Sequence, residues 1–136
     1  MPINQEWIQN GINNDAINWA NELGNRLSTP AGPKKALTSS QIRKFFGELK
    51  RIQVDPILYQ SDIPMLKAKL AYAVGRAANR NGNQVNYESR IIDFYNEIIV
   101  GLDYLRNDEQ FLKDDFINFV KLIEAVVAFH KYYGGK

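Results

Sequence analysis

Lysine and arginine side chains recur in the middle of the sequence at intervals of seven residues. Arg43 and Lys50 are seven positions apart, and so are Lys44 and Arg51. Seven residues are almost two turns of an α-helix, so the members of each pair point in nearly the same direction. Cations at this spacing suit a phosphate backbone, whose charges repeat regularly and whose bound counterions are released on contact.

A second group of cations falls on the next predicted helix. Lys69, Arg76 and Arg80 lie within about 40° of one another on a helical wheel. Tyr72 lies beside them, and Lys67 lies on the other side of the apolar face. A solvated helix face explains such a row as well as a bound nucleic acid does, so the charges alone leave both interpretations open.

The charges of the chain are segregated along its length. The formal net charge of the 136 residues is only +2. Residues 34–90 contain eleven basic and four acidic residues, whereas residues 1–33 contain one basic and three acidic, and residues 91–136 five basic and eight acidic. The candidate binding helices therefore lie in a strongly basic segment between two mildly acidic ones.

Residues suited to catalysis or metal binding are scarce. The absence of cysteine excludes disulfides, thiolate zinc sites and cysteine nucleophiles, and a single histidine, His130, excludes a two-histidine zinc helix. The acidic pairs Asp108/Glu109 and Asp114/Asp115 are adjacent in sequence, so their side chains diverge by about 100° on a helix. We interpret them as solvated residues near a helix start. The sequence predicts no catalytic residue, no metal and no cofactor, and it predicts a packed or interface role for His130.

No segment is apolar over the roughly 20 residues that a bilayer-spanning helix needs. The N-terminus has neither the basic start nor the apolar stretch of a secretory signal. We therefore expect a soluble, cytoplasmic protein without membrane contact.

Apolar residues recur every three or four positions over most of the chain, which predicts helices. The predicted helices cover approximately residues 4–27, 38–55, 62–79, 87–105 and 107–132. Thr38 and Gln41 have the spacing of a capping box at the start of the second helix. Two prolines and a glycine make residues 28–36 a loop. Together these features predict one all-α domain over residues 1–136, a compact bundle of about five helices without strands.

The last predicted helix has an unusually wide apolar surface. Leu122, Phe129 and Tyr133 form a second stripe beside the main one and widen the apolar arc to about 180°. A helix of this kind is either central in its own bundle or packed against another subunit. Both alternatives stay open, and the three residues are candidates for a protein interface.

Three blocks of the sequence resemble the small subunit of the type III-A CRISPR Csm effector complex. The blocks are Leu37–Phe46, Leu66–Arg76 and Glu124–Lys136, and they occur in the family's order and at about its spacing. The resemblance covers roughly residues 37–76 and 116–136, whereas residues 1–36 and 80–110 match little.

The resemblance implies an all-helical, non-catalytic protein that stacks in several copies along a ribonucleoprotein. It implies contact with the guide–target RNA duplex, mainly the target strand, through the sugar-phosphate backbone and without sequence specificity. The expected partners are therefore guide RNA, single-stranded target RNA, other Csm subunits and further copies of the chain. Apart from the resemblance, the exposed apolar stripes are compatible with a homodimer of the isolated protein, and the sequence leaves monomer and homodimer open.

Candidate RNA-binding residues come from the resemblance and from charge geometry. The resemblance assigns this role to cations within its blocks: Arg43, Lys44, Lys67, Lys69, Arg76 and Lys131. Charge geometry alone adds three more: Lys50, Arg51 and Arg80. The alternative function is a purely structural adaptor whose basic face binds an acidic partner subunit.

Overall fold

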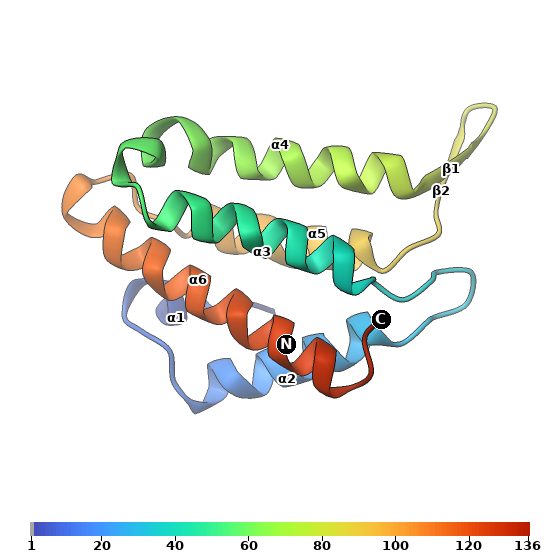
Figure 1. Ribbon diagram of the computed structural model, residues 1–136, viewed down its shortest axis with the longest axis horizontal. Helices are drawn as coiled ribbons and strands as arrows, with labels where there is room; N and C mark the ends of the chain where they lie inside the picture. The colour runs from blue at the N-terminus through green and yellow to red at the C-terminus, as the bar shows by residue number, and fades with distance from the viewer. Residues whose placement is uncertain (1) are drawn as a thin grey trace.

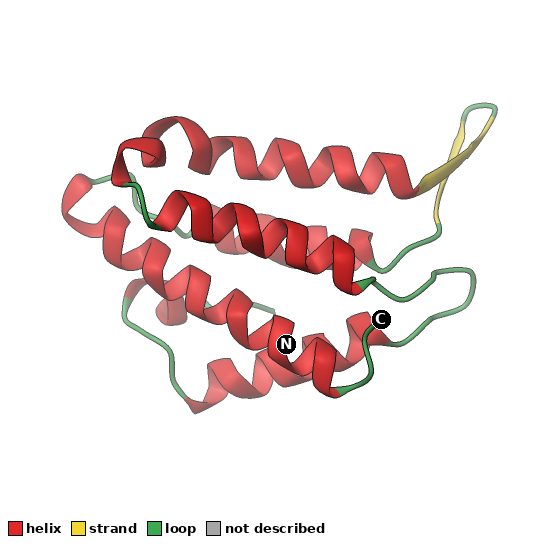
Figure 2. Cartoon of the chain, in the orientation of Figure 1, coloured by secondary structure: helices red, strands yellow, loops and turns green. Residues whose placement is uncertain are grey.

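The computed structural model describes residues 2–136, apart from the side chain of Arg80. This part of the chain forms six α-helices, a single 3₁₀ turn and a two-stranded hairpin (Figures 1 and 2). The predicted all-α fold class is therefore confirmed. In chain order the elements are α1 (Gln5–Gln9), α2 (Asn14–Ser28), α3 (Ser39–Gln53), η1 (Pro56–Leu58), α4 (Tyr59–Ala77), β1 (Ala78–Asn81), β2 (Gln84–Tyr87), α5 (Ile91–Asp103) and α6 (Glu109–Tyr132).

The core is built around α6, which packs against α1, α2 and α3. Its side chains Phe116, Phe119, Ile123 and Val126 have no accessible surface. On the other side of α3, α4 packs against α3 and α5. Figure 1 accordingly shows α4, α3, α6 and α2 in succession across the molecule.

The helix predicted over residues 4–27 is in fact two helices. Gly11 has a φ of 117°, a conformation that glycine adopts far more readily than other residues. Asn13 then caps α2 by accepting a hydrogen bond from the backbone N–H of Ala16 at 3.0 Å. The apolar spacing continues across the break because both helices pack against α6.

The capping box predicted at the start of α3 is confirmed. The hydroxyl of Thr38 accepts from the backbone N–H of Gln41 at 3.1 Å, and the Gln41 side chain accepts from the N–H of Thr38 at 2.9 Å. These bonds satisfy two groups at the start of the helix and fix the first turn of α3.

The expectation of a chain without strands is wrong at residues 78–87. There β1 and β2 form an antiparallel hairpin, closed by a turn in which Gly82 has a φ of 64°. Only Val85 in the middle of this segment is apolar, so the sequence lacks the alternation that predicts a strand. In consequence α4 ends at Ala77, and α5 begins only at Ile91.

The predicted loop at residues 28–36 is held in place by backbone hydrogen bonds. Ala31 and Lys34 exchange two of them, at 3.0 and 2.9 Å. The N–H of Lys35 donates to the carbonyl of Glu88, and the N–H of Arg90 donates to the carbonyl of Lys35, both at 2.8 Å. The loop is thus tied to the segment that joins the hairpin to α5.

Helices α2 and α6 pack tightly against each other at Gly24. A Cβ atom on Gly24 would lie 2.6 Å from the Cβ of Phe129 and 2.8 Å from the backbone nitrogen of His130. We expect Gly24→Ala to lower the free energy of unfolding by about 2 kcal/mol, because the added methyl forces two packed helices apart. Urea denaturation measures this loss.

Gly47 is the matched control for this substitution. It lies in α3, and a Cβ atom there would have no neighbour within 4 Å. Gly47→Ala should therefore raise the stability by roughly 0.5–1 kcal/mol, the difference in helix propensity. Equal changes in the two variants would contradict the close packing of α2 and α6.

Candidate nucleic-acid interface

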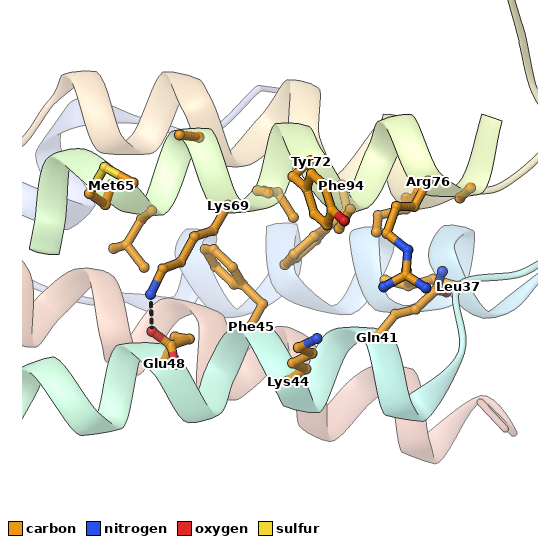
Figure 3. A pocket seen from close by; sticks show the side chains of 16 residues that line it. Leu37, Gln41, Lys44, Phe45, Glu48, Met65, Lys69, Tyr72, Arg76 and Phe94 are labelled. Carbon is orange, nitrogen blue, oxygen red and sulfur yellow. Dashed lines mark hydrogen bonds and ion pairs between the residues drawn. The ribbon is translucent and has the colours of Figure 1, made fainter.

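Helices α3 and α4 border a groove of about 700 Å³, which Ile91 and Phe94 of α5 also line (Figure 3). Its floor is apolar and tightly packed, since Phe45, Leu70 and Phe94 are each no more than 6% exposed. Ala73 and Ala77 line it from α4, and their short side chains leave space between the two helices.

Polar side chains from both helices form the rim of the groove. Gln41, Lys44 and Glu48 come from α3, and Lys69 and Arg76 come from α4. Figure 3 shows Lys69 reaching across to Glu48, whereas Lys44 and Arg76 lie nearer the other end. The structure therefore brings three of the predicted RNA-binding cations to one groove.

Glu48 neutralises part of this positive charge. It accepts a hydrogen bond from Lys69 Nζ at 2.8 Å and one from Arg51 Nη2 at 3.0 Å. The bonds from Lys69 and Arg51 lower the pKa of Glu48 below its ordinary value. Arg51 also donates to Asp62 at 2.8 Å and so lowers the pKa of that carboxyl. Lys69 and Arg51 are thus already paired with carboxylates.

Lys44 and Arg76 are the unpaired cations of the groove. Neither makes an ion pair within residues 2–136. The Arg76 guanidinium carbon lies 6.0 Å from the centre of the Tyr72 ring, and Tyr72 is 69% exposed. The groove therefore offers two free cations, and one of them, Arg76, lies beside an exposed aromatic ring.

The other predicted RNA-binding cations lie outside the groove. Arg43 and Lys50 are exposed on α3, and Lys131 is exposed near the end of α6. Lys67 borders a smaller depression of about 170 Å³ between α4 and α5, on the side of α4 that its wheel position predicted. The side chain of Arg80 lies outside the described part of the structure.

The predicted protein interface is largely internal to the chain. Leu122 has no accessible surface, because α2 of the same chain packs against α6, so it is a core residue and not an interface contact. Phe129 is half-buried beside Gly24. Tyr133 is 38% exposed, and its hydroxyl donates to the side-chain oxygen of Asn21. Of the two alternatives for the last helix, the central position in its own bundle is observed.

His130 is a packed residue, as predicted. It is 1% exposed, and its Nε2 donates to the carbonyl oxygen of Leu37 at 2.6 Å. Gly135 lies directly against the imidazole ring, where a Cβ atom would overlap it. These contacts join the end of α6 to the segment before α3.

Asp115 is not the solvated residue that the sequence predicted. It has no accessible surface and accepts three hydrogen bonds from Arg106: from its backbone N–H at 3.1 Å, its Nε at 2.9 Å and its Nη2 at 2.7 Å. The bond to Asp115 raises the pKa of Arg106. Arg106 also donates to the carbonyl of Gln9 at 3.2 Å. This ion pair therefore joins the α5–α6 connection to α6 and to α1.

Within residues 2–136 no group of three histidine, cysteine, aspartate or glutamate side chains is placed to hold a metal ion. No helix in that range is long and apolar enough to cross a membrane. The chemistry that the groove does offer is binding, through free cations, an aromatic ring and an apolar floor.

These features define the class: a small, predominantly helical protein with a groove between α3 and α4 that cations border. The family model described as Csm2 Type III-A matches residues 12–136, and the chain therefore belongs to the Csm2 family of type III-A CRISPR systems. The match confirms the resemblance of the three sequence blocks and extends it to the segments between them. Csm2 is a family of structural small subunits, so this chain is a small subunit of a multi-subunit Csm complex. No curated protein and no solved structure matches the chain.

Proposed function

We propose that this Csm2 subunit is a non-catalytic RNA-binding protein that contacts the guide–target duplex, mainly the target strand, through the α3–α4 groove. The observation that carries the proposal is the pair of unpaired cations that border the groove. Lys44 and Arg76 project from different helices, and neither has a carboxylate partner among residues 2–136. Two such groups on one rim can contact phosphates of the same strand.

Recognition by these groups is indifferent to base sequence. Contacts to phosphates position a nucleic acid without reading its bases. Tyr72 adds a stacking surface that any base can use, because every base has a π face. Sequence choice is then left to base pairing between guide and target, as the family resemblance implies.

The remaining exposed cations extend the RNA path beyond the groove. Arg43 and Lys50 are exposed on α3, Lys67 lies on the other side of α4, and Lys131 lies near the end of α6. These residues supply sequence-independent attraction that weakens with salt. Arg51 and Lys69 bind RNA less strongly, because phosphate has to displace Glu48 or Asp62 from them.

In the assembled complex we propose guide RNA, target RNA, other Csm subunits and stacked copies of this chain as its partners, in the cytoplasm. The isolated chain would be a monomer or a weakly associated homodimer, and light scattering distinguishes the two. Self-association would use exposed residues such as Tyr133 rather than the buried Leu122.

The test compares the assembled complex with and without the charge reversal Arg43→Glu/Arg76→Glu. If these residues bind RNA, the variant complex assembles with all its subunits but binds target RNA more weakly. If the chain is instead an adaptor whose basic face meets an acidic subunit, the variant fails to assemble. Native mass spectrometry measures assembly, and filter binding measures target affinity.

Removal of the Glu48 carboxylate should strengthen RNA binding. Glu48→Gln releases Lys69 from its ion pair, leaves Arg51 paired with Asp62 alone, and removes a negative charge from the groove. We expect about a fivefold gain in affinity at 0.1 M salt, the equivalent of one further phosphate contact on a single strand. Fluorescence anisotropy with a labelled single-stranded RNA measures the gain.

The pH dependence of this effect follows from the lowered pKa of Glu48. Glu48 stays ionised at neutral pH and loses its charge only as the pH falls through that lowered pKa, so wild type and Glu48→Gln should converge only in acid, below about pH 4.5. The contribution of its ion pairs to stability is lost over the same acid range. Glu22→Gln, an exposed acid on α2, is the control of equal charge. An equal gain in affinity in Glu22→Gln would mean that net charge, and not the position of Glu48 in the groove, causes the effect.

A further inference from the structure

One face of the β1–β2 hairpin carries only carboxamide side chains. Asn79 lies opposite Asn86, and Asn81 lies opposite Gln84. Residues that are directly opposite in an antiparallel pair share a face, and successive residues of a strand alternate between faces, so these four side chains lie together. All four are exposed. Their one hydrogen bond within the described residues joins Asn79 Nδ2 to Glu88 Oε1, at 3.4 Å.

This carboxamide face offers hydrogen bonds without charge. Each amide provides two N–H donors and one acceptor oxygen, and no apolar side chain interrupts the face. A ligand that matches it presents paired donors and acceptors rather than a phosphate or an apolar surface. The ribose 2′-hydroxyl is such a group, and it is the group by which proteins distinguish RNA from DNA.

The position of the hairpin connects this face with the groove. Helix α4 ends at Ala77, one residue after Arg76 on the rim, and β1 begins at the next residue, Ala78. Figure 1 shows the hairpin extending from the end of α4 beyond the bundle. Its base is anchored by the backbone bonds of Lys35 to Glu88 and Arg90. An RNA strand that runs along α4 past Arg76 would therefore reach the hairpin.

We propose that the carboxamide face of the hairpin binds ribose 2′-hydroxyl groups and gives the subunit a preference for RNA over DNA. This proposal rests on the proposed RNA binding at the groove, and it assigns to the hairpin a separate contribution. The groove cations attract either polymer by charge, and the amides distinguish the sugar.

The test compares binding of single-stranded RNA and single-stranded DNA of one sequence made of A and C only, so that both polymers carry the same bases. The variant is Asn81→Thr/Gln84→Thr/Asn86→Thr, which removes three carboxamides, keeps residues that favour strands and leaves Asn79 with Glu88. Wild type should prefer RNA, and the variant should lose about tenfold of that preference because three hydrogen bonds are removed. Its salt dependence should equal that of wild type, since no charge is changed.

Arg76→Gln is the matched control, in which the salt dependence should change and the RNA preference should not. It removes one phosphate contact, so the slope of log K against log salt should fall by about 0.7 while the RNA-to-DNA ratio stays unchanged. A second measurement changes the RNA and leaves the protein intact: RNA with 2′-O-methyl groups, which cannot donate a hydrogen bond from the 2′ position, should bind wild type more weakly than ordinary RNA does. This arm holds even if the substitutions disturb the hairpin.

The proposal is overturned if the variant keeps the wild-type RNA-to-DNA ratio, or if it changes the preference between oligo-A and oligo-C instead. Equal binding of RNA and DNA by wild type would overturn the hairpin proposal alone. Wild type that binds neither polymer would overturn the groove as an autonomous RNA site, and the hairpin proposal with it.

Discussion

Replacement of Lys44 and Arg76 by glutamine should weaken the binding of single-stranded RNA about 20-fold at 0.1 M salt. Each phosphate contact on a single strand contributes about −0.7 to the slope of log K against log salt, so the loss of two contacts should also reduce that slope by about 1.4. The effect is large because these are the groove cations that no carboxylate neutralises within residues 2–136. Glutamine keeps much of the length of each side chain and removes only its charge.

Anisotropy titrations between 50 and 200 mM salt measure both quantities in one experiment. The control is Lys113→Gln/Lys121→Gln, which removes the same charge from exposed positions on α6. An equal loss in the control would mean that the net charge, and not the groove, determines binding. If wild type does not bind RNA at low salt, the isolated groove is insufficient and RNA contact has to be sought in the assembled complex.

Asp115→Ala should lower the free energy of unfolding by about 3 kcal/mol. The loss is large because Asp115 is fully buried and its carboxylate accepts charge-assisted hydrogen bonds from Arg106, whose side chain is 35% exposed. Here the substitution removes three hydrogen bonds from Arg106. It also weakens the link that Arg106 makes to the carbonyl of Gln9 in α1. We expect the α5–α6 connection and α1 to loosen together.

Urea denaturation of Asp115→Ala beside Asp114→Ala isolates this contribution. Asp114 is the preceding residue in the same helix and is exposed, so its substitution should change the stability by less than about 0.5 kcal/mol. Asp115→Asn should fall between wild type and alanine, since an amide oxygen still accepts from the backbone N–H of Arg106. Similar losses of stability in Asp114→Ala and Asp115→Ala would contradict the assignment of Asp115 as the structural partner of Arg106.

Much of the fold could be predicted because the helices are strongly periodic. The capping pair Thr38 and Gln41 located the start of α3 correctly, and Asp108 at the start of α6 accepts from the N–H of Gln110 as a cap. The break at Gly11 was missed, since the apolar spacing on either side of it is continuous. The hairpin was missed because its stability does not come from apolar alternation, the signal by which strands are recognised.

For the candidate site, the sequence could predict only which side chains point away from the core. Helical wheels placed Lys44, Lys69 and Arg76 away from the core, and the groove contains all three. The wheels could not show that Glu48 lies within 2.8 Å of Lys69, which is 21 residues further along the chain. The same limit applies to Asp115, because its burial depends on Arg106 folding back over the start of α6.

The central position of α6 has a consequence for the timing of folding during synthesis. α1 and α2 pack mainly against residues 109–132, about 100 positions further along the chain. At ribosomal rates this separation corresponds to a delay on the order of 5–20 seconds. During that interval Trp7 and Trp19, whose ring centres are 5.9 Å apart in the folded chain, can contact each other but lack most of their core. Folding is thus completed only when α6 leaves the ribosome, and until then the nascent chain is a candidate for chaperones that cover exposed tryptophan.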